Sequence, residues 1–260
     1  MLRLALALLA FVSTAHAQLN DTGLLDCYNH LQTPVGTVST TTPDPEPTGF
    51  NEQDCTRGRA AAEAMGVLTK VGASTVAGRD YTKIAHNGSV LTAGAALGAG
   101  PTDWACTRDN VTGLLWEVKT TDGGLRDRSH QYTWFNTDTN ENNGVPGTET
   151  SFGCGGTLAG NTCNTSRFVA AVNAGGGLCG RTDWRMPTED ELVGLVAWGN
   201  GGTQIDTTYF PNSASSIYMA AETFAATASD ARRVSFGGGD PNVFQKSDAA
   251  YVRLVAGGTP

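Results

Sequence analysis

The six cysteines of this chain limit its fold more than any other feature, because all of them follow an N-terminal export signal. Arg3 supplies a positive charge, Leu4–Val12 is apolar, and Ala15–Ala17 has the small-residue pattern of a cleavage site. Residues 1–17 are therefore predicted to be a signal peptide, and the mature chain is expected to begin at Gln18. The apolar run is shorter than the roughly 20 residues that cross a bilayer, so we expect no membrane span after cleavage. An uncleaved N-terminal anchor is the alternative.

Export places these cysteines in an oxidising compartment, where an even number predicts disulfides instead of thiol chemistry. Their spacing lacks the paired C-x-x-C units of a structural zinc site. We therefore expect an extracytoplasmic protein, in the periplasm, at the cell surface or secreted. Many connectivities are open to six cysteines, and a glycine-rich loop favours joining the fourth to the fifth. The expected disulfides are Cys27–Cys55, Cys106–Cys179 and Cys154–Cys163.

The charge balance argues against some partners. The net charge is −8 and charged residues make up only 16% of the chain. No bulk positive field therefore attracts nucleic acid or a heparin-type polysaccharide. Only a local basic patch is expected, formed by Lys83, Arg232, Arg233 and Lys246.

Residues 18–100 are predicted to be a loop-rich N-terminal segment. Thr33–Gly49 is rich in threonine and proline, which is typical of an extended linker or surface loop. Asp54 is the expected N-cap of a helix over Cys55–Met65, and Gly66 can end that helix.

Several short strands are expected. Tyr81–Ile84 and Ser89–Leu91 flank Asn87–Gly88, a strong hairpin signal. A turn over Asp109–Gly113 then leads into the next strand. The remaining predicted strands are Leu114–Lys119, Ser216–Met219, Arg232–Phe236 and Ala250–Val255.

Two short helices complete the pattern. Asn164 or Thr165 caps the first, over Arg167–Ala174, which Gly175 closes. Thr188–Glu191 is a capping box that begins the second. Short helices among short strands predict an α+β domain with small antiparallel sheets. The second helix presents Leu192, Leu195 and Val196 on one face and ends at Gly199.

Four sequence blocks carry a family resemblance. The most specific is the D-W-R-x-P-T-x-x-E-L pattern at Asp183–Leu192. Across residues 101–257 the chain resembles the Lcl C-terminal domain family, found at the end of collagen-like bacterial adhesins and long regarded as a domain of unknown function. The four blocks are Asp103–Glu117, Leu178–Leu192, Ile205–Asn212 and Tyr251–Val255.

The resemblance implies a C-type-lectin-like fold, with two helices on small antiparallel sheets. It also implies surface adhesion and binding of glycans or glycosaminoglycans, and it brings no catalytic residue set. One stretch departs from the family. Where the family usually has Tyr/Phe-Trp-Ser-Ser-Thr, this chain has Tyr218–Thr223, without the tryptophan and both serines.

The aromatic and charged residues of these blocks allow two interpretations. Trp116 and Trp184 would stack on a ligand or, as we expect, pack in the core. Asp183 and Arg185 would contact a ligand or, as we expect, form a structural ion pair or turn cap. Glu191 is the predicted capping-box acid.

A calcium site is a hypothesis for the long polar insertion, residues 136–163. Oxygen-bearing side chains alternate there in a spacing like that of an EF-hand loop. An EF-hand loop needs glycine at its sixth position, and this chain has Asn143 there, so a solvated loop is the alternative. The candidate ligands are Asp138, Asn140, Asn142 and Glu149.

Enzyme signals are weak. Gly175–Gly180 matches a dinucleotide-binding pattern but follows a predicted helix instead of a strand. His30, His86 and His130 are scattered in polar surroundings and are expected at the surface. No cofactor other than calcium is indicated.

The sequence therefore predicts a non-enzymatic adhesin or binding domain for a glycan or a surface protein. Residues 136–150 and 212–248 are the expected binding face, because polar loops on a rigid scaffold usually carry recognition. A structural subunit of a surface filament or envelope assembly, hence a homo-oligomer, is the alternative. A secreted enzyme is a third reading.

Overall fold

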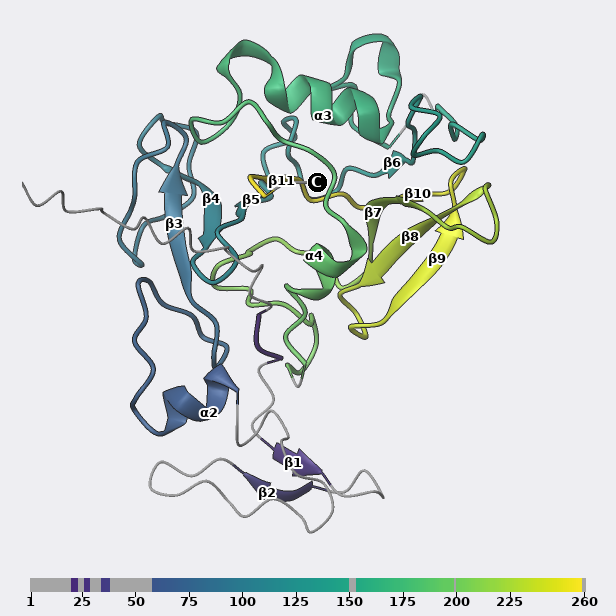
Figure 1. Cartoon of the computed structure of the whole chain (residues 1–260). Helices are drawn as coiled ribbons and strands as arrows, with labels where there is room; N and C mark the ends of the chain where they lie inside the picture. The colour runs from purple at the N-terminus through teal and green to yellow at the C-terminus, as the bar shows by residue number, and fades with distance from the viewer. Residues whose placement is uncertain are drawn as a thin grey trace, which may run out of the picture.

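The computed structural model describes residues 20–22, 26–28, 34–37, 58–149, 153–198 and 200–258. In these ranges the chain is an α+β protein with short helices and small antiparallel sheets. The two larger sheets, of four and three strands, lie at the left and at the right of Figure 1, with a short helix between them. None of the helices in the described ranges has the length and apolar content needed to cross a bilayer. The predicted signal peptide lies outside the described residues.

The four-stranded sheet has the order β11-β5-β4-β3, and every pair in it is antiparallel. The predicted hairpin turn is confirmed, since the Gly88 N–H donates to Ala85 O (2.9 Å) and the φ of Gly88 is 86°. Its second arm is only a bridge from Val90 to Ile84, shorter than the predicted strand. The Asp109–Gly113 turn is confirmed as well. The strands are β3 (Tyr81–Ala85), β4 (Trp104–Asp109), β5 (Leu115–Glu117) and β11 (Val255–Ala256).

The three-stranded sheet has the order β7-β8-β9, and smaller pairs surround it. Five of the described strands were not expected from the sequence: β1, β2, β4, β6 and β9. The predicted single strand over Ala250–Val255 is divided into β10 and β11, which belong to different sheets. The bounds are β7 (Ile217–Thr223), β8 (Asp230–Ser235), β9 (Pro241–Gln245), β6 (Tyr132–Thr133), β10 (Ala249–Ala250), β1 (Asp26–Tyr28) and β2 (Pro34–Thr37).

Three α-helices lie in the described ranges. The prediction that Asp54 caps the first was wrong: α2 (Arg59–Ala64) begins after Gly58, which makes no side-chain cap. Asn164 caps α3 (Thr165–Asn173), as expected, with its side chain accepting from Arg167 N at 2.9 Å.

The predicted capping box is present at the start of α4 (Glu189–Val193). The helix ends at Val193, before the predicted Gly199, and Gly194 is its C-cap. Two 3₁₀ turns flank α3, at Ala159–Asn161 and Ala174–Gly176.

Two hydrophobic clusters form the core. The first packs α3 against both described disulfides, and Tyr132 stacks on Phe168 with ring centroids 4.6 Å apart. The second packs α4 between the two larger sheets, with Leu192 fully buried. Trp184 belongs to the first cluster and Trp116 to the second, so the expected core role of both tryptophans is confirmed.

The disulfides Cys106–Cys179 and Cys154–Cys163 are present as predicted. The third expected pair involves Cys55, which lies outside the described residues. The first bridge joins β4 to the loop before α4, and the second closes the loop before α3.

A buried ion pair joins Glu117, the last residue of β5, to Lys119. Lys119 Nζ lies 2.7 Å from Glu117 Oε1, and both side chains are almost fully buried. Burial lowers the pKa of Lys119, and the Glu117 carboxylate opposes that shift. Arg253 donates to Glu117 O, and Leu254 N donates to Glu117 Oε2 at 3.0 Å. The opposite charges of this buried cluster compensate one another inside the fold.

Candidate functional site

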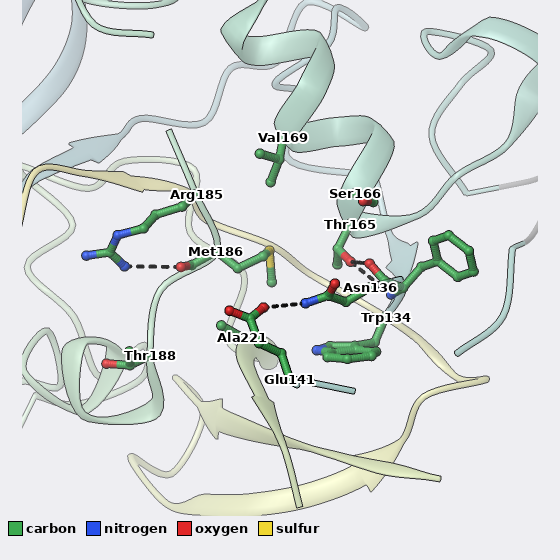
Figure 2. Close-up of a pocket in the computed structure, with 11 residues that line it drawn as sticks. Trp134, Asn136, Glu141, Thr165, Ser166, Val169, Arg185, Met186, Thr188 and Ala221 are labelled. Atoms are coloured by element: carbon green, nitrogen blue, oxygen red, sulfur yellow. Dashed lines mark hydrogen bonds between the residues drawn. The ribbon is translucent and has the colours of Figure 1, made fainter. Parts of the chain in front are cut away.

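A pocket of about 290 Å³ opens between α3, the loop 136–149 and β7. Figure 2 shows its side chains converging from these three elements and from the segment that precedes α4. Apolar surface comes from Trp134, Phe135, Val169, Met186 and Ala221. Polar surface comes from Asn136, Glu141, Thr165, Ser166, Arg185 and Thr188.

We call this cavity the amide pocket. Its polar edge is formed by Asn136 and Glu141. Asn136 Nδ2 donates to Glu141 Oε2 at 2.6 Å, and the carboxylate of Glu141 is exposed (Figure 2). Thr165, in the first turn of α3, donates to Phe135 O (3.1 Å) and accepts from Phe135 N (2.9 Å). The loop and the helix are therefore tied together at the pocket floor, and the Asn136–Glu141 pair stays open to solvent.

Lys246 holds the loop 136–149 from within. Its Nζ donates to Asn142 O (3.0 Å) and Val145 O (2.7 Å) and lies 4.0 Å from the centroid of the Trp134 ring. Burial lowers the pKa of Lys246. An ammonium group between carbonyl oxygens and an aromatic face orders the loop in the way a bound cation would.

The opposite wall is fixed by Arg185. Its guanidinium binds Glu191 in a two-point contact (2.8 and 2.7 Å) and donates to Gly257 O (3.0 Å). Glu191 raises the pKa of Arg185, and the same carboxylate accepts from Thr188 N as the capping-box acid. The structural ion pair expected for Arg185 is confirmed, with Glu191 as its partner, whereas Asp183 pairs with Arg181.

The structure separates the four candidate calcium ligands. Asp138 Oδ1 accepts from Asn140 N (2.9 Å), so these two lie together at the exposed end of the loop. Asn142 is buried and its Oδ1 accepts from Gly144 N (2.7 Å).

Glu149 instead faces α3. It accepts from Asn164 Nδ2 (3.1 Å) and lies 3.6 Å from Arg167 Nε. Within the described ranges, no three His, Cys, Asp or Glu side chains are grouped so as to hold a metal ion. Calcium binding through Asp138, Asn140, Asn142 and Glu149 stays a prediction.

The expected basic patch is wrong, because two of its members are buried. Lys83 donates to Ala95 O at 2.7 Å over the ring of Trp104, and Lys246 lies inside the loop described above. Arg232 lies 3.6 Å from Glu189.

The expected surface position of His130 is also wrong. Only 6% of this residue is exposed, since the loop around Gly155 covers its ring. His86 is half-buried and contacts Gly98 O, and His30 lies outside the described residues.

Sequence reasoning found three of the eleven residues that line the amide pocket. The loop 136–149 and β7 were expected in the binding face, and Asn136, Glu141 and Ala221 come from them. The contributions of Thr165, Ser166 and Val169 were missed. The only sequence signal for these three residues was the helical periodicity, which places them on the face of α3 that lines the pocket.

The structure described is a disulfide-stapled α+β protein with a loop-and-helix pocket. Residues 105–256 match the Lcl C-terminal domain family, more than half of the 260-residue chain, and the chain belongs to that family. The match begins within β4, so β3 and the preceding described segment lie before it. No curated protein and no solved structure matches the chain.

Proposed function

We propose that this protein is an extracytoplasmic, non-enzymatic binding protein, an adhesin-type domain with a C-type-lectin-like fold, and that it recognises a glycan or a surface protein through the amide pocket. The observation that carries the proposal is the exposed Asn136–Glu141 pair beside the apolar side chains of Val169 and Met186. A pocket with mostly apolar lining and a few placed polar groups is the usual form of a ligand site.

The chemistry of the pocket suits a sugar. An amide and a carboxylate side by side offer one set of donors and several acceptors, which neighbouring hydroxyl groups can satisfy in both directions. The C–H face of a sugar ring would lie against the apolar side chains. The amide, carboxylate and hydroxyl groups that line the pocket are suited to holding a ligand.

The pocket is ordered before any ligand arrives. Lys246 fixes the loop from below, Thr165 joins it to α3, and the Cys154–Cys163 bridge closes the segment that leads into α3. Preorganised walls reduce the entropy lost on binding. The two disulfides are typical of an oxidising compartment, which supports an extracytoplasmic location.

The test is a glycan array and a cell-surface binding assay, each run with added calcium and with EDTA. We expect saturable binding that falls about tenfold in Glu141→Gln, since hydrogen bonds to a charged group contribute strongly. Ser166→Trp should block the pocket from the exposed face of α3. Asp122→Asn, which removes one exposed negative charge outside the expected binding face, is the matched control.

Unchanged melting temperatures would show that these variants fold. Equal binding by Glu141→Gln and Asp122→Asn would contradict the proposal, as would a protein that binds neither glycans nor cells. Binding that requires calcium and is lost in Asp138→Ala would add a metal to the site.

A further inference from the structure

A second pocket, of about 360 Å³, lies away from the amide pocket, where the Asn87–Gly88 turn meets the Cys179–Gly180 turn beside β4 and β5. We call it the arginine pocket, because Arg108 and Arg181 line it and no aspartate or glutamate of the described residues does. This is unusual in a chain whose net charge is −8.

Arg108 is the important side chain. It lies on β4 in a row across the sheet, between Thr82 on β3 and Leu115 on β5. The residue is half-buried, and its guanidinium makes no hydrogen bond or ion pair in the described part of the chain. A half-buried arginine without a carboxylate partner keeps its full charge and all its donors for an incoming anion.

The turn that forms the facing wall adds backbone donors. Leu178 and Arg181 exchange two hydrogen bonds (2.9 and 3.0 Å), and Cys179 and Gly180 between them have φ of 53° and 70°. These are the dihedral angles of a tight two-residue hairpin turn. The N–H groups of Cys179 and Gly180 have no acceptor within the described ranges, so they remain free to donate.

The wall is held in place. A Cβ on Gly88 would lie 3.0 Å from Cys179 O, so the two turns are in contact and only glycine fits there. The Cys106–Cys179 disulfide joins this turn to β4 at a position two residues before Arg108. The strand that carries Arg108 and the turn that carries the free amides are therefore fixed relative to one another.

The second arginine is already engaged. Arg181 Nε donates to Asp183 Oδ1 at 2.7 Å, and Arg181 lowers the pKa of Asp183 to about 2. The pair is exposed at the rim, so it contributes little net charge, and Arg108 remains the unbalanced cation of the pocket.

From these contacts we propose that the arginine pocket binds the carboxylate of a small ligand, a sugar acid or the carboxyl end of a chain. The planar guanidinium of Arg108 matches a carboxylate, and the Cys179 and Gly180 amides complete its coordination. The proposal is independent of the amide pocket, and either site can fail without the other.

The experiment follows backbone amide resonances of the mature protein at low salt while ligand is added. The probes are two matched pairs, glucuronate with glucose and N-acetylglycine with N-acetylglycinamide. We expect saturable shifts of the Cys179 and Gly180 amides with at least one carboxylate and none with its neutral partner. Glucuronate alone would identify a sugar acid, and N-acetylglycine would identify a chain end.

Variants separate the pocket from general charge effects. Arg108→Met should weaken carboxylate binding at least about tenfold, and Arg108→Lys should restore part of it. Arg128→Met, which removes an exposed and unpartnered arginine outside the pocket, should bind like the wild type. No shift with either carboxylate, equal shifts with the neutral partners, or equal loss in both methionine variants would overturn the proposal.

Discussion

Arginine lines both pockets, and Arg185 of the amide pocket and Arg108 of the arginine pocket are used in opposite ways. Arg185 in the amide pocket is bound to Glu191 in a two-point contact, so its charge is neutralised within the fold. Arg108 in the arginine pocket has no such partner in the described part of the chain. In an acidic protein, the location of an unpaired cation is therefore a better guide to anion binding than the net charge.

The largest expected effect is on the wall of the arginine pocket. Replacing Cys106 and Cys179 together with alanine should lower the free energy of unfolding by about 4 kcal/mol, because this bridge closes the longer loop. The same change at Cys154 and Cys163 should cost about 3 kcal/mol. The sequence separations are 73 and 9 residues. Urea unfolding of both double variants measures the difference, and equal losses would contradict it.

Removing the paired arginine should cost more than removing the free one. Arg185 and Glu191 are only 21% and 17% exposed, so Arg185→Met leaves a poorly solvated carboxylate without a partner. We expect a loss of about 3 kcal/mol for Arg185→Met and less than about 0.5 kcal/mol for Arg108→Met. Thermal and urea unfolding measure both. A large loss of unfolding free energy in Arg108→Met would show that Arg108 stabilises the fold as Arg185 does, and would contradict the contrast between the two arginines.

Lys246 offers a test of the amide pocket alone. Lys246→Met keeps most of the side-chain volume but leaves Asn142 O and Val145 O without their donor. We expect a loss of about 2 kcal/mol in unfolding free energy and faster amide exchange across the loop 136–149. Carboxylate binding at the arginine pocket should not change. Unaltered exchange in the loop would refute the role assigned to the ammonium group.

The smallest effect is expected at Asp183. Arg181 holds the pKa of Asp183 at about 2, so the stabilisation by the carboxylate is complete above pH about 4 and is lost as the pH falls towards 2. Asp183→Asn lacks this loss, and its melting temperature should fall less steeply than that of the wild type between these values. At neutral pH the exposed pair contributes less than about 1 kcal/mol. The variant also frees Arg181, so carboxylate affinity should rise about twofold to fivefold.

Local signals predicted the fold well where a few neighbouring residues decide it. The capping box at Thr188–Glu191, the Asn164 cap and the Asn87–Gly88 turn are all present. The division of the C-terminal strand between two sheets was not predicted, because strand partners are chosen by packing over long sequence distances. The early start expected for α2 failed because a capping residue alone does not determine where a helix begins.

The sites show the same limit. The sequence indicated the loop 136–149 as a recognition surface, and nothing in it marked Lys246 as the cation inside that loop. Lys83 and Lys246 were expected at the surface because lysine is rarely buried. Carbonyl oxygens and aromatic rings from distant segments satisfy both ammonium groups, and a linear pattern does not contain such contacts.

The amino-acid sequence alone determined the family match, the α+β class, the local Cys154–Cys163 pair and the caps of α3 and α4, because each depends on residue identity or on neighbours along the chain. Only the tertiary structure decided which charged groups are paired and which are free. Arg108 and Arg185 have the same chemistry, and the three-dimensional position of a carboxylate separates them. A charge is neutralised by whatever lies within a few ångströms, and folding selects those neighbours from the whole chain.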